Sequence, residues 1–379
     1  MARNLKGNRS YFRSTPLMSS ALAAVLALTP IAVSHGSELR NSASRAPSVK
    51  GIGDRQPGQS TSGHAPIAYV VGWLTGPSCP NGHCNFWAPG TYWAIDTGNG
   101  RRLSLSHKPR FSEAEAFGMV VAPNGVKGYV TADTDGTVTP VDLRTNRPYV
   151  TVPLGCTPLA STIVPSGRFL YVLCYGGTVR PLATRTDRLG APIRVPGGSS
   201  SIAASPDGRW VAVTAPRGIW LIDTQTDRLR AKVALHGTPT YLVFDPTGEV
   251  AYVVDGTAIV SINMLSMLPT SRISIRLRRG DVPSGFVMAP DGLKAYVVTY
   301  NEYGDSGSVV PIDLTRGVAA PFKVLRSLRP ADVAITPDSK DLYIASPSNG
   351  EVAEFAVATS RVIARSAGLD NPTAIAIGP

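Results

Sequence analysis

A short motif recurs about every 42 residues through most of the chain. In each copy an apolar run ends in Pro, and a polar residue and Gly usually follow, as in Ala203–Gly208. Successive prolines of this motif lie 42, 41, 40, 44, 47 and 42 residues apart. They are Pro123, Pro165, Pro206, Pro246, Pro290, Pro337 and Pro379. This period is the length of one four-stranded blade, so the spacing predicts a β-propeller.

Each Pro-Gly turn separates two runs that have the composition of β-strands. The run after the turn is β-branched and aromatic, as in Ala-Tyr-Val-Val at 251–254, and the pair predicts a hairpin. A third run often closes on Asp and is followed by Thr-Asn/Asp-Arg, as at Asp223 and 226–228. Because Asp side chains commonly cap tight turns, we interpret these residues as turn formers before a fourth strand and not as catalytic groups.

The two ends of the repeat array complete one another. The first repeat begins at its second strand, at 67–71, and the run at 374–377 supplies a first strand only. Joining them makes a seventh blade and leaves no unpaired sheet edge at the seam. We therefore predict an all-β fold over residues 65–379. It is a seven-bladed β-propeller of four-stranded antiparallel blades, with the ring closed by the C-terminal strand joining the N-terminal blade.

Composition agrees with this fold class and excludes others. Of the 379 residues, 43% are hydrophobic and 17% are charged, which supplies a core and excludes a disordered chain. The 37 Gly and 32 Pro disfavour long helices and coiled coils.

The first 64 residues differ from the repeats. Residues 1–34 combine four basic residues, an apolar stretch at 17–33 and a small-residue exit, which is the form of a secretory signal peptide. The alternative is an uncleaved N-terminal anchor, which would be the only membrane contact that we expect. Residues 35–64 are rich in Ser, Gly, Pro and Arg and predict a flexible tether. We therefore expect the protein to be secreted, either extracellular or attached to the cell surface.

The formal net charge of +11 favours polyanion partners in general. Without residues 1–34 the chain has 33 basic and 26 acidic residues, a net charge of +7. Its basic residues are spread through turns and form no stripe with aromatic residues, so we expect no nucleic-acid partner.

The four cysteines fall into two local pairs. Cys79 and Cys84 enclose a short turn-rich loop, and Cys156 and Cys174 flank a predicted hairpin centred on 165–167. A secreted chain permits disulfides, so local pairing is favoured, although the connectivity cannot be read from sequence alone. Metal binding by Cys79, His83 and Cys84 is the alternative, but it lacks a fourth ligand at zinc-site spacing.

The repeats resemble those of a known family. The Pro-Asp-Gly turns, the Ala-Tyr-Val-Val and Gly-Tyr-Val-Thr strands and the sequence Val-Asp-Leu-x-Thr-Asn are similar to the YVTN repeats of surface-layer and secreted bacterial β-propellers. The resemblance covers residues 65–379. It implies the architecture and says little about activity, because many unrelated functions share the propeller.

Three unusually long connections are predicted on one face of the ring. They lie at 72–91, 107–117 and 299–308, and binding residues concentrate on such loops of rigid scaffolds. The candidate binding residues are Trp73, Phe86, Trp87, His107, Lys108, Arg110, Tyr300, Glu302, Tyr303 and Asp305. Exposed aromatic and mixed-charge side chains of this kind suit a glycan, peptide or cell-wall component.

Two functions are compatible with these features. The favoured one is a binding or scaffold module, expected to be monomeric, for a wall component, glycan, peptide or protein partner. The alternative is a lactonase or lyase acting on a small molecule at the channel mouth. The predicted innermost strands place acids only at Asp245 and Asp332, and His83, His107 and His236 are not expected to converge. We therefore predict no catalytic residue, metal or cofactor.

Two short matches are given no functional role. The sequence Asp-Thr-Asp-Gly at 133–136 has the carboxylate spacing of part of a calcium loop, but it lacks the bidentate acid of an EF-hand, so we expect a turn. The adhesion tripeptide Arg-Gly-Asp at 279–281 is too short to exclude chance. The basic residues beside it, Arg276 and Arg278, could instead meet acidic wall polymers.

Overall fold

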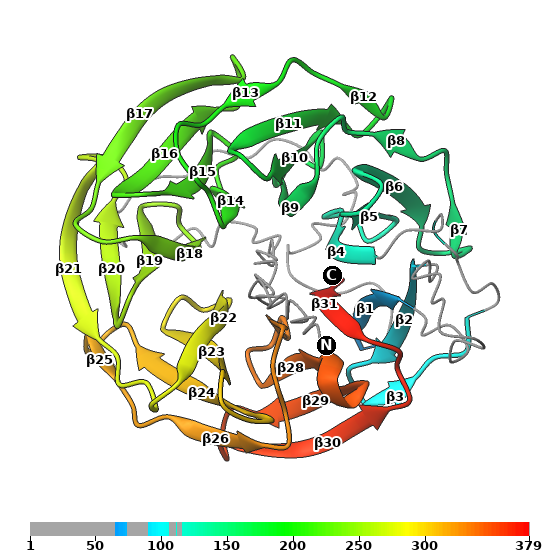
Figure 1. The fold of residues 1–379 in the computed structure, drawn as a ribbon, viewed down its shortest axis with the longest axis vertical. Coiled ribbons are helices and arrows are strands. Elements are labelled where there is room, and N and C mark those ends of the chain that lie inside the picture. The colour runs from blue at the N-terminus through cyan, green and yellow to red at the C-terminus, as the bar shows by residue number, and fades with distance from the viewer. Residues whose placement is uncertain (1–64, 74–89, 106–110, 112–115, 379) are drawn as a thin grey trace, which may run out of the picture.

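The computed structural model describes residues 65–73, 90–105, 111 and 116–378, and these residues form seven antiparallel sheets arranged as a ring (Figure 1). Each sheet is one blade, and its strands are arranged side by side from the centre of the ring to its rim. The helical content of the described residues is one 3-10 turn, η1 (Pro347–Asn349). The predicted seven-bladed β-propeller is confirmed. Residues 1–64, with the expected signal peptide and tether, lie outside the described residues.

The innermost strand of each blade lies next to the central axis and is largely buried. From blade 1 to blade 7 these strands are β31 (Pro372–Ile377), β4 (Ala116–Val121), β9 (Pro158–Ile163), β14 (Ile202–Ala204), β18 (Pro239–Phe244), β22 (Asp281–Met288) and β27 (Asp332–Ile335). Ala, Ser, Thr, Val and Ile recur in these strands and suit the narrow space where seven sheets converge, although β4, β18 and β22 also carry aromatic residues.

The second and third strands form the middle of each blade. The second strands are β1 (Ile67–Trp73), β5 (Lys127–Ala132), β10 (Phe169–Cys174), β15 (Trp210–Ala215), β19 (Val250–Asp255), β23 (Lys294–Asn301) and β28 (Asp341–Ser346). The third strands are β2 (Gly90–Asp96), β6 (Thr137–Asp142), β11 (Thr178–Ala183), β16 (Gly218–Asp223), β20 (Ala258–Asn263), β24 (Ser306–Asp313) and β29 (Glu351–Ala356). Their apolar side chains point to both sides because each blade is covered by two neighbours.

The outer strands are more polar because one edge and much of their surface meet water. In blades 2, 3 and 6 the outer strand is broken into two short strands that pair with the same third strand. The outer strands are β3 (Arg101–Arg102), β7 (Arg147–Pro148), β8 (Val152–Pro153), β12 (Arg188–Leu189), β13 (Ile193–Arg194), β17 (Arg228–Ala234), β21 (Leu268–Ser274), β25 (Val318–Ala319), β26 (Lys323–Arg326) and β30 (Arg361–Ala367).

The ring is closed as the repeat pattern predicts. Strand β31 pairs antiparallel with β1, with Ile375 opposite Val70. The hydroxyl of Thr373 shares its one hydrogen between the carbonyl oxygens of Val71 (3.3 Å) and Ala116 (3.1 Å), which joins β31 to its own blade and to blade 2. The seam is therefore sealed by both backbone and side-chain contacts.

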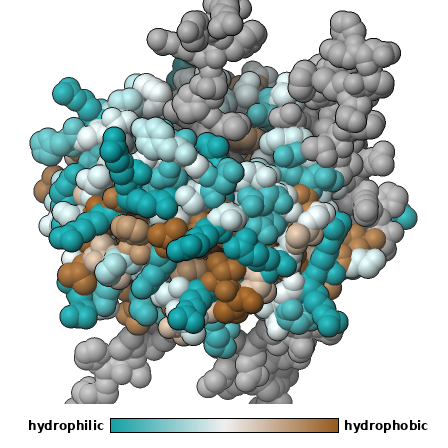
Figure 2. Space-filling view, turned by 60° about the horizontal axis from the view of Figure 1, so that its bottom comes forward, coloured by the Kyte–Doolittle hydropathy of each residue, from teal (hydrophilic) through white to brown (hydrophobic). Residues whose placement is uncertain are grey.

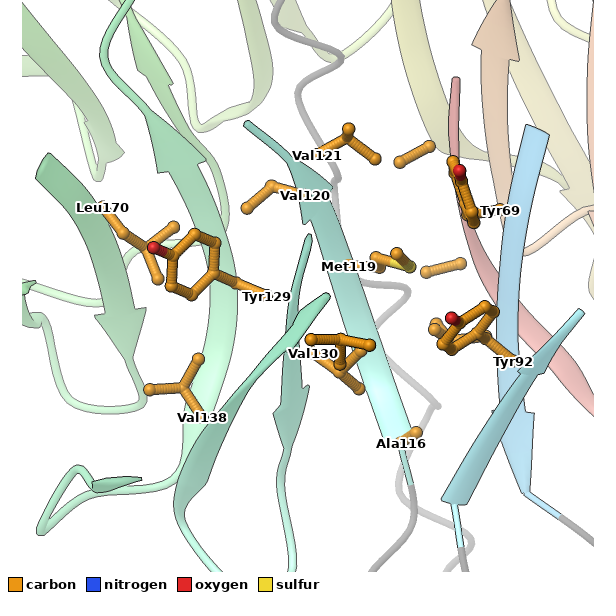
Figure 3. Close-up of a cluster of buried hydrophobic side chains, with 14 of the residues drawn as sticks. Tyr69, Tyr92, Ala116, Met119, Val120, Val121, Tyr129, Val130, Val138 and Leu170 are labelled. Carbon is orange, nitrogen blue, oxygen red and sulfur yellow. The ribbon is translucent and has the colours of Figure 1, made fainter. Parts of the chain in front are cut away.

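Apolar side chains from adjacent blades fill the space between the sheets. In the cluster that spans blades 1 to 3, Met119 lies on the side of β4 that faces Tyr69 and Tyr92, and Tyr129 lies beside Leu170 (Figure 3). All five side chains are at most 6% exposed. Burial of whole aromatic and aliphatic side chains at every blade interface is the main source of stability that this fold offers.

The recurring turn residues have the geometry that their chemistry suggests. In the turns before the outer strands, Asn146 and Asp227 have φ of 57° and 52°, in the left-handed region that Asn and Asp tolerate best after Gly. Asp142 caps the same kind of turn, since one carboxylate oxygen accepts hydrogen bonds from the backbone N–H groups of Arg144 (2.9 Å) and Thr145 (3.1 Å). The interpretation of these Asp residues as turn formers is confirmed.

The two faces of the ring differ in what they carry. One face carries the turns between second and third strands together with the connections that run from one blade to the next; we call it the crossing face and the connections the crossings. The other face carries the turns between first and second and between third and fourth strands. The connection at 299–308 belongs to the crossing face, because it joins the second and third strands of blade 6.

Candidate functional site

The strongest departure from the repeat among the described residues is a long hairpin in blade 6. Strands β23 and β24 have eight residues each, whereas the second and third strands of blades 2 to 5 and of blade 7 have six. They continue to Asn301 and resume at Ser306, so the turn between them is only 302–305. The expected 10-residue loop at 299–308 is therefore wrong. The additional residues extend the sheet on the crossing face, and we call residues 299–308 the blade 6 hairpin.

A buried carboxylate explains why these polar residues remain in strands. Asp281, the first residue of β22, has a fully buried side chain. One oxygen accepts hydrogen bonds from the Asn301 amide (2.8 Å) and Arg278 Nε (3.1 Å). The other accepts hydrogen bonds from the hydroxyls of Thr299 (3.0 Å) and Ser308 (2.7 Å). Both strands of the hairpin are thus tied to one charged group whose hydrogen-bonding capacity is well used.

Arg278 completes this arrangement from the crossing between blades 5 and 6. Its guanidinium lies 3.0 Å from the Asp281 carboxylate and also donates a 2.8 Å hydrogen bond to the hydroxyl of Ser306. The charge of the buried carboxylate is therefore compensated. Since the Asp281 side chain is not exposed, the Arg-Gly-Asp tripeptide cannot offer its carboxylate to a receptor.

The turn of the hairpin presents Tyr303 to solvent in a defined position. The side chain is 79% exposed, yet its backbone N–H donates a 3.0 Å hydrogen bond to the Asn301 side chain. The N–H of Glu302 donates to the carbonyl oxygen of Gly280 (2.8 Å). Gly280 has a φ of 82° and lies directly against the Tyr303 ring, where a Cβ atom would collide. The positive φ favours glycine at this position, and a Cβ atom there would displace the Tyr303 ring.

The crossing between blades 6 and 7 supports the other side of the hairpin. The guanidinium of Arg329 lies over the ring of Tyr300, 5.1 Å from its centre. The N–H of Arg329 donates to the hydroxyl of Ser346 (3.0 Å), and the Asn349 amide donates to the carbonyl oxygen of Ser327 (2.7 Å). The hairpin is therefore held between two crossings that both carry arginines.

The structure brings some of the predicted binding residues together and leaves others apart. Tyr300, Glu302, Tyr303 and Asp305 share the blade 6 hairpin, with Glu302 and Asp305 exposed at its turn. Trp73 is the half-buried last residue of β1 in blade 1, and blade 7 lies between blades 1 and 6 in the ring. The other candidates lie outside the described residues, and so do two of the cysteines: Phe86, Trp87, His107, Lys108, Arg110, Cys79 and Cys84. A surface shared by the three connections remains a prediction.

Sequence reasoning did not assign a role to the residues that support the hairpin. In the sequence Asp281 stands out only as part of the tripeptide and Arg278 only as part of a basic cluster, and Arg329 belongs to no motif. A weak signal is present, because Arg-Arg-Gly at 278–280 leads directly into an inner strand that begins with Asp281. The pairing of Asp281 with Asn301, twenty residues away, becomes visible only in the folded sheet.

The acids of the inner strands have structural partners. Asp245 follows β18 and accepts a 2.8 Å hydrogen bond from the N–H of Val250, which confirms its role as a turn cap. Asp332 is buried and accepts hydrogen bonds from its neighbour Val333 N–H (2.8 Å) and, across the blade interface, from Ile375 N–H (3.0 Å). The expectation that only Asp245 and Asp332 place acids on inner strands is corrected by Asp281, because β22 begins earlier than the apolar run suggests.

A groove of about 300 Å³ opens near the rim between blades 4 and 5. His236 and Arg272 line it, together with Asp255, which is 4% exposed and pairs with Arg272 at 3.3 Å. Within the described part of the chain, no three His, Cys, Asp or Glu side chains lie close enough to hold a metal ion together. His236 is exposed and stands in blade 4, away from the blade 6 hairpin.

Cys156 and Cys174 form a disulfide, as the local pairing predicted. The bond joins the crossing between blades 2 and 3 to the end of β10. Disulfides persist in non-reducing compartments, so this bond indicates such a setting for the folded protein. Among the residues described, no helix has the length and apolar character needed to span a bilayer.

Comparisons with known proteins identify the fold. No protein-family profile and no curated protein sequence match the chain. Solved structures do match: hydrazine synthase from Kuenenia stuttgartiensis (TM-score 0.61, 20% identity, 68% of this chain and 88% of that one) and a protein of unknown function from Desulfotomaculum acetoxidans (0.65, 16%, 82% and 98%). A provisionally assigned 6-phosphogluconolactonase from Bacteroides uniformis also matches (0.66, 16%, 82% and 99%). At these identities the likeness establishes a shared seven-bladed propeller, with 6-phosphogluconolactonase-like structures among the neighbours.

Proposed function

We propose that the protein is a secreted or surface-attached propeller of the YVTN-repeat type that binds a wall component, glycan, peptide or protein through the blade 6 hairpin. One observation carries this proposal. A hairpin whose strands are two residues longer than those of blades 2 to 5 and 7 is fixed by the buried Asp281 and displays a 79% exposed tyrosine at its turn. A rigid support under an exposed aromatic side chain is what a recognition surface needs, because little conformational entropy is lost on binding.

The setting of the protein supports the same proposal. The Cys156–Cys174 disulfide and the signal-like residues 1–34 both favour export. The turn at 302–305 is a loop held by a rigid scaffold, and binding residues are found disproportionately on such loops.

Substitution of the two hairpin tyrosines tests this function. Binding to isolated cell-wall and surface-polysaccharide fractions is compared for the wild type, Tyr303→Ala and Tyr300→Ala/Tyr303→Ala. The matched control is Tyr149→Ala, since Tyr149 is 50% exposed in blade 2 and also contacts a cationic side chain. We expect the double variant to lose at least about tenfold in affinity, which is the effect of about 1.4 kcal/mol, and the control to bind as the wild type does. Equal binding by all variants would contradict the proposal.

A lactonase or lyase at the channel mouth is the second candidate. It is favoured by the likeness to structures titled as lactonases and by two buried carboxylates, Asp281 and Asp332, at the starts of neighbouring inner strands. The test is turnover of a panel of sugar lactones, with and without added divalent metal. Turnover by the wild type that is lost in Asp332→Asn and retained in Tyr303→Ala would favour the enzyme over the binding module.

A further inference from the structure

We infer that the ligand of the blade 6 hairpin is an anionic glycan, whose carboxylate or phosphate groups are bound by arginines on both sides of the hairpin while its sugar rings lie on the tyrosines. This inference rests on the proposed function and specifies the chemical class of the ligand. It starts from the distribution of charge around the hairpin.

Three exposed arginines flank the hairpin. Arg279 lies in the crossing before β22, and its carbonyl oxygen accepts a 2.9 Å hydrogen bond from the Asn301 amide. Arg326 is the last residue of β26 and is paired in the sheet with Ser306, where the second hairpin strand begins. Arg329 lies over the ring of Tyr300. The backbone contacts thus fix the arginine Cα positions on the two sides of one narrow element.

Unlike Arg278 and Arg365, these three arginines have no carboxylate partner among the residues that the structure describes. Arg278 is paired with Asp281, and Arg365 is paired with Glu351 at 2.7 Å. Across the described residues, no ion pair involves Arg279, Arg326 or Arg329. The carboxylates of Asp281 and Glu351 are therefore already paired with Arg278 and Arg365. The guanidinium groups of the three flanking arginines are left for an external oxyanion. Guanidinium is well suited to that role because its fork of donors matches carboxylate and phosphate groups.

The tyrosines between these arginines define the rest of the ligand. Tyr303 offers an exposed ring with a hydroxyl at its edge, and Tyr300 offers a half-buried one. Rings of this kind combine an apolar face with a hydrogen-bonding tip, which suits a sugar that has an apolar face and hydroxyl groups. On the side of the ring that carries β26 and β30, long hydrophilic side chains stand among apolar areas (Figure 2).

Two carboxylates favour a glycan over a nucleic acid. Glu302 and Asp305 are exposed in the same four-residue turn as Tyr303. They can accept hydrogen bonds from sugar hydroxyls, but they repel a backbone with a phosphate at every residue. Arginines at the sides and acids at the turn therefore match a chain whose charges are spaced by neutral hydroxyl-bearing units.

Calorimetric titration with defined oligosaccharides tests this inference. The probes are an oligogalacturonate, a neutral oligogalactose of the same length, a phosphate-bearing glycan oligomer and a single-stranded oligonucleotide of matched charge. We expect one of the two anionic glycans to bind at least about tenfold more tightly than the neutral one, and the stronger of the two identifies the anion. Raising salt from about 50 to about 300 mM should weaken this binding, because charge pairs at a surface are screened.

Arginine variants with a matched control complete the test. Arg279→Gln/Arg329→Gln should lose at least about tenfold in affinity for the anionic glycan. The affinity of Arg279→Lys/Arg329→Lys should lie between those of the wild type and the Gln variant. The control is Arg188→Gln/Arg361→Gln, which changes two exposed arginines at the starts of outer strands in blades 3 and 7. Unfolding midpoints close to the wild type confirm that the glutamine variants are folded.

The outcomes separate this inference from the proposed function. Equal binding of neutral and anionic glycans, or unchanged binding by Arg279→Gln/Arg329→Gln, overturns the ligand class. The proposed function then still stands if Tyr303→Ala abolishes binding to wall fractions, and it fails with the inference if that variant binds normally. Tighter binding of the oligonucleotide, or no binding of any glycan probe, also overturns the inference.

Discussion

The hydroxyl of Tyr171 in blade 3 donates a 2.6 Å hydrogen bond to the carboxylate of Asp227 in the turn before the outer strand of blade 4. The same relation recurs around the ring: the hydroxyl of Tyr343 in blade 7 donates to the carbonyl oxygen of Thr97 in blade 1 (3.2 Å). Two motifs that are far apart in each repeat, the Tyr of the second strand and the turn before the fourth, are thus joined between neighbouring blades.

Replacing Tyr171 with Phe should destabilise the protein by about 1–2 kcal/mol, because it removes a partly buried hydrogen bond to a charged group. The measurement is urea unfolding followed by intrinsic fluorescence. Tyr252→Phe is the control at the same repeat position, since the Tyr252 hydroxyl has no hydrogen-bond partner within the described residues. Equal effects of the two substitutions would show that the tie between blades contributes nothing.

Asp281→Ala should lower the free energy of unfolding by about 3–5 kcal/mol, because it leaves the Arg278 guanidinium partly buried without its partner. The blade 6 hairpin should loosen more than the rest of the ring. Amide hydrogen exchange of Glu302 and Tyr303 reports this directly. In Arg278→Ala/Asp281→Ala the loss should be smaller than the sum of the single losses, and strict additivity would argue against the pair as the support of the hairpin.

Replacing Asp133 or Asp142, which lie in the hairpin formed by β5 and β6, with Asn should change the stability of the protein in opposite directions. Burial raises the pKa of Asp133, and its Oδ1 finds no hydrogen-bond partner among the residues the structure describes. The backbone N–H groups of Thr145 and Arg144 lower the pKa of Asp142. At neutral pH Asp133→Asn should therefore stabilise the protein slightly, whereas Asp142→Asn should destabilise it.

The pH dependence gives the sign of each effect. A raised pKa means that the ionised Asp133 penalises the folded state, so the benefit of Asp133→Asn should disappear as the pH falls below the ordinary carboxyl pKa of about 3.9. Asp142 contributes stability above its unfolded pKa and loses it as the pH falls through its lowered folded pKa. Unfolding at neutral pH and at about pH 3 checks both signs, and two effects of the same sign at neutral pH would contradict them.

The Cys156–Cys174 disulfide should contribute about 3 kcal/mol, as estimated from the loop entropy of a sequence separation of 18 residues. The double variant Cys156→Ser/Cys174→Ser should show this loss in urea unfolding without reductant. Wild-type protein unfolded in the presence of reductant should approach the variant. A variant as stable as the oxidised wild type would mean that the bond does not constrain the unfolded chain.

Ile375→Ala should lower the free energy of unfolding by about 2–5 kcal/mol, because Ile375 is 1% exposed in the strand that closes the ring. Deleting residues 371–379 should lower the thermal midpoint further, since it also removes the backbone pairing with β1. The control is Ile363→Ala, whose side chain is 57% exposed on β30 and whose effect should stay within about 0.5 kcal/mol. A deletion that leaves the midpoint unchanged would contradict closure through β31.

The architecture could be predicted from sequence because it depends on local signals that repeat. Pro206 and Gly208 specify a turn from their own backbone preferences, and the regular distance to the next such turn specifies a blade. Even Ser339, which replaces Gly in blade 7, adopts the left-handed conformation with a φ of 61°. The closing strand followed from counting strands, which requires no contact to be known.

The support of the candidate site could not be predicted in the same way. The segment from Thr299 to Ser308 has the composition of a loop, and it stays in the sheet because Asp281 satisfies side chains from both strands. That interaction joins residues 18 to 27 positions apart and depends on the register between β22 and β23. Propensity describes each residue alone, whereas this hairpin depends on one buried charge that is shared by several of them.

Closure by β31 also bears on how separate molecules meet. The hydroxyl of Thr373 bonds to Val71, 302 residues earlier in the sequence, so this seam joins the most distant parts of the propeller. A ring opened at this seam exposes the hydrogen-bonding edge of β1 and frees a strand of complementary sequence. In concentrated solution, β31 of one opened molecule can fill blade 1 of another and restore every contact of the seam. A dimer that exchanges β31 between two molecules therefore requires only the seam to open, while the rest of each ring keeps its structure.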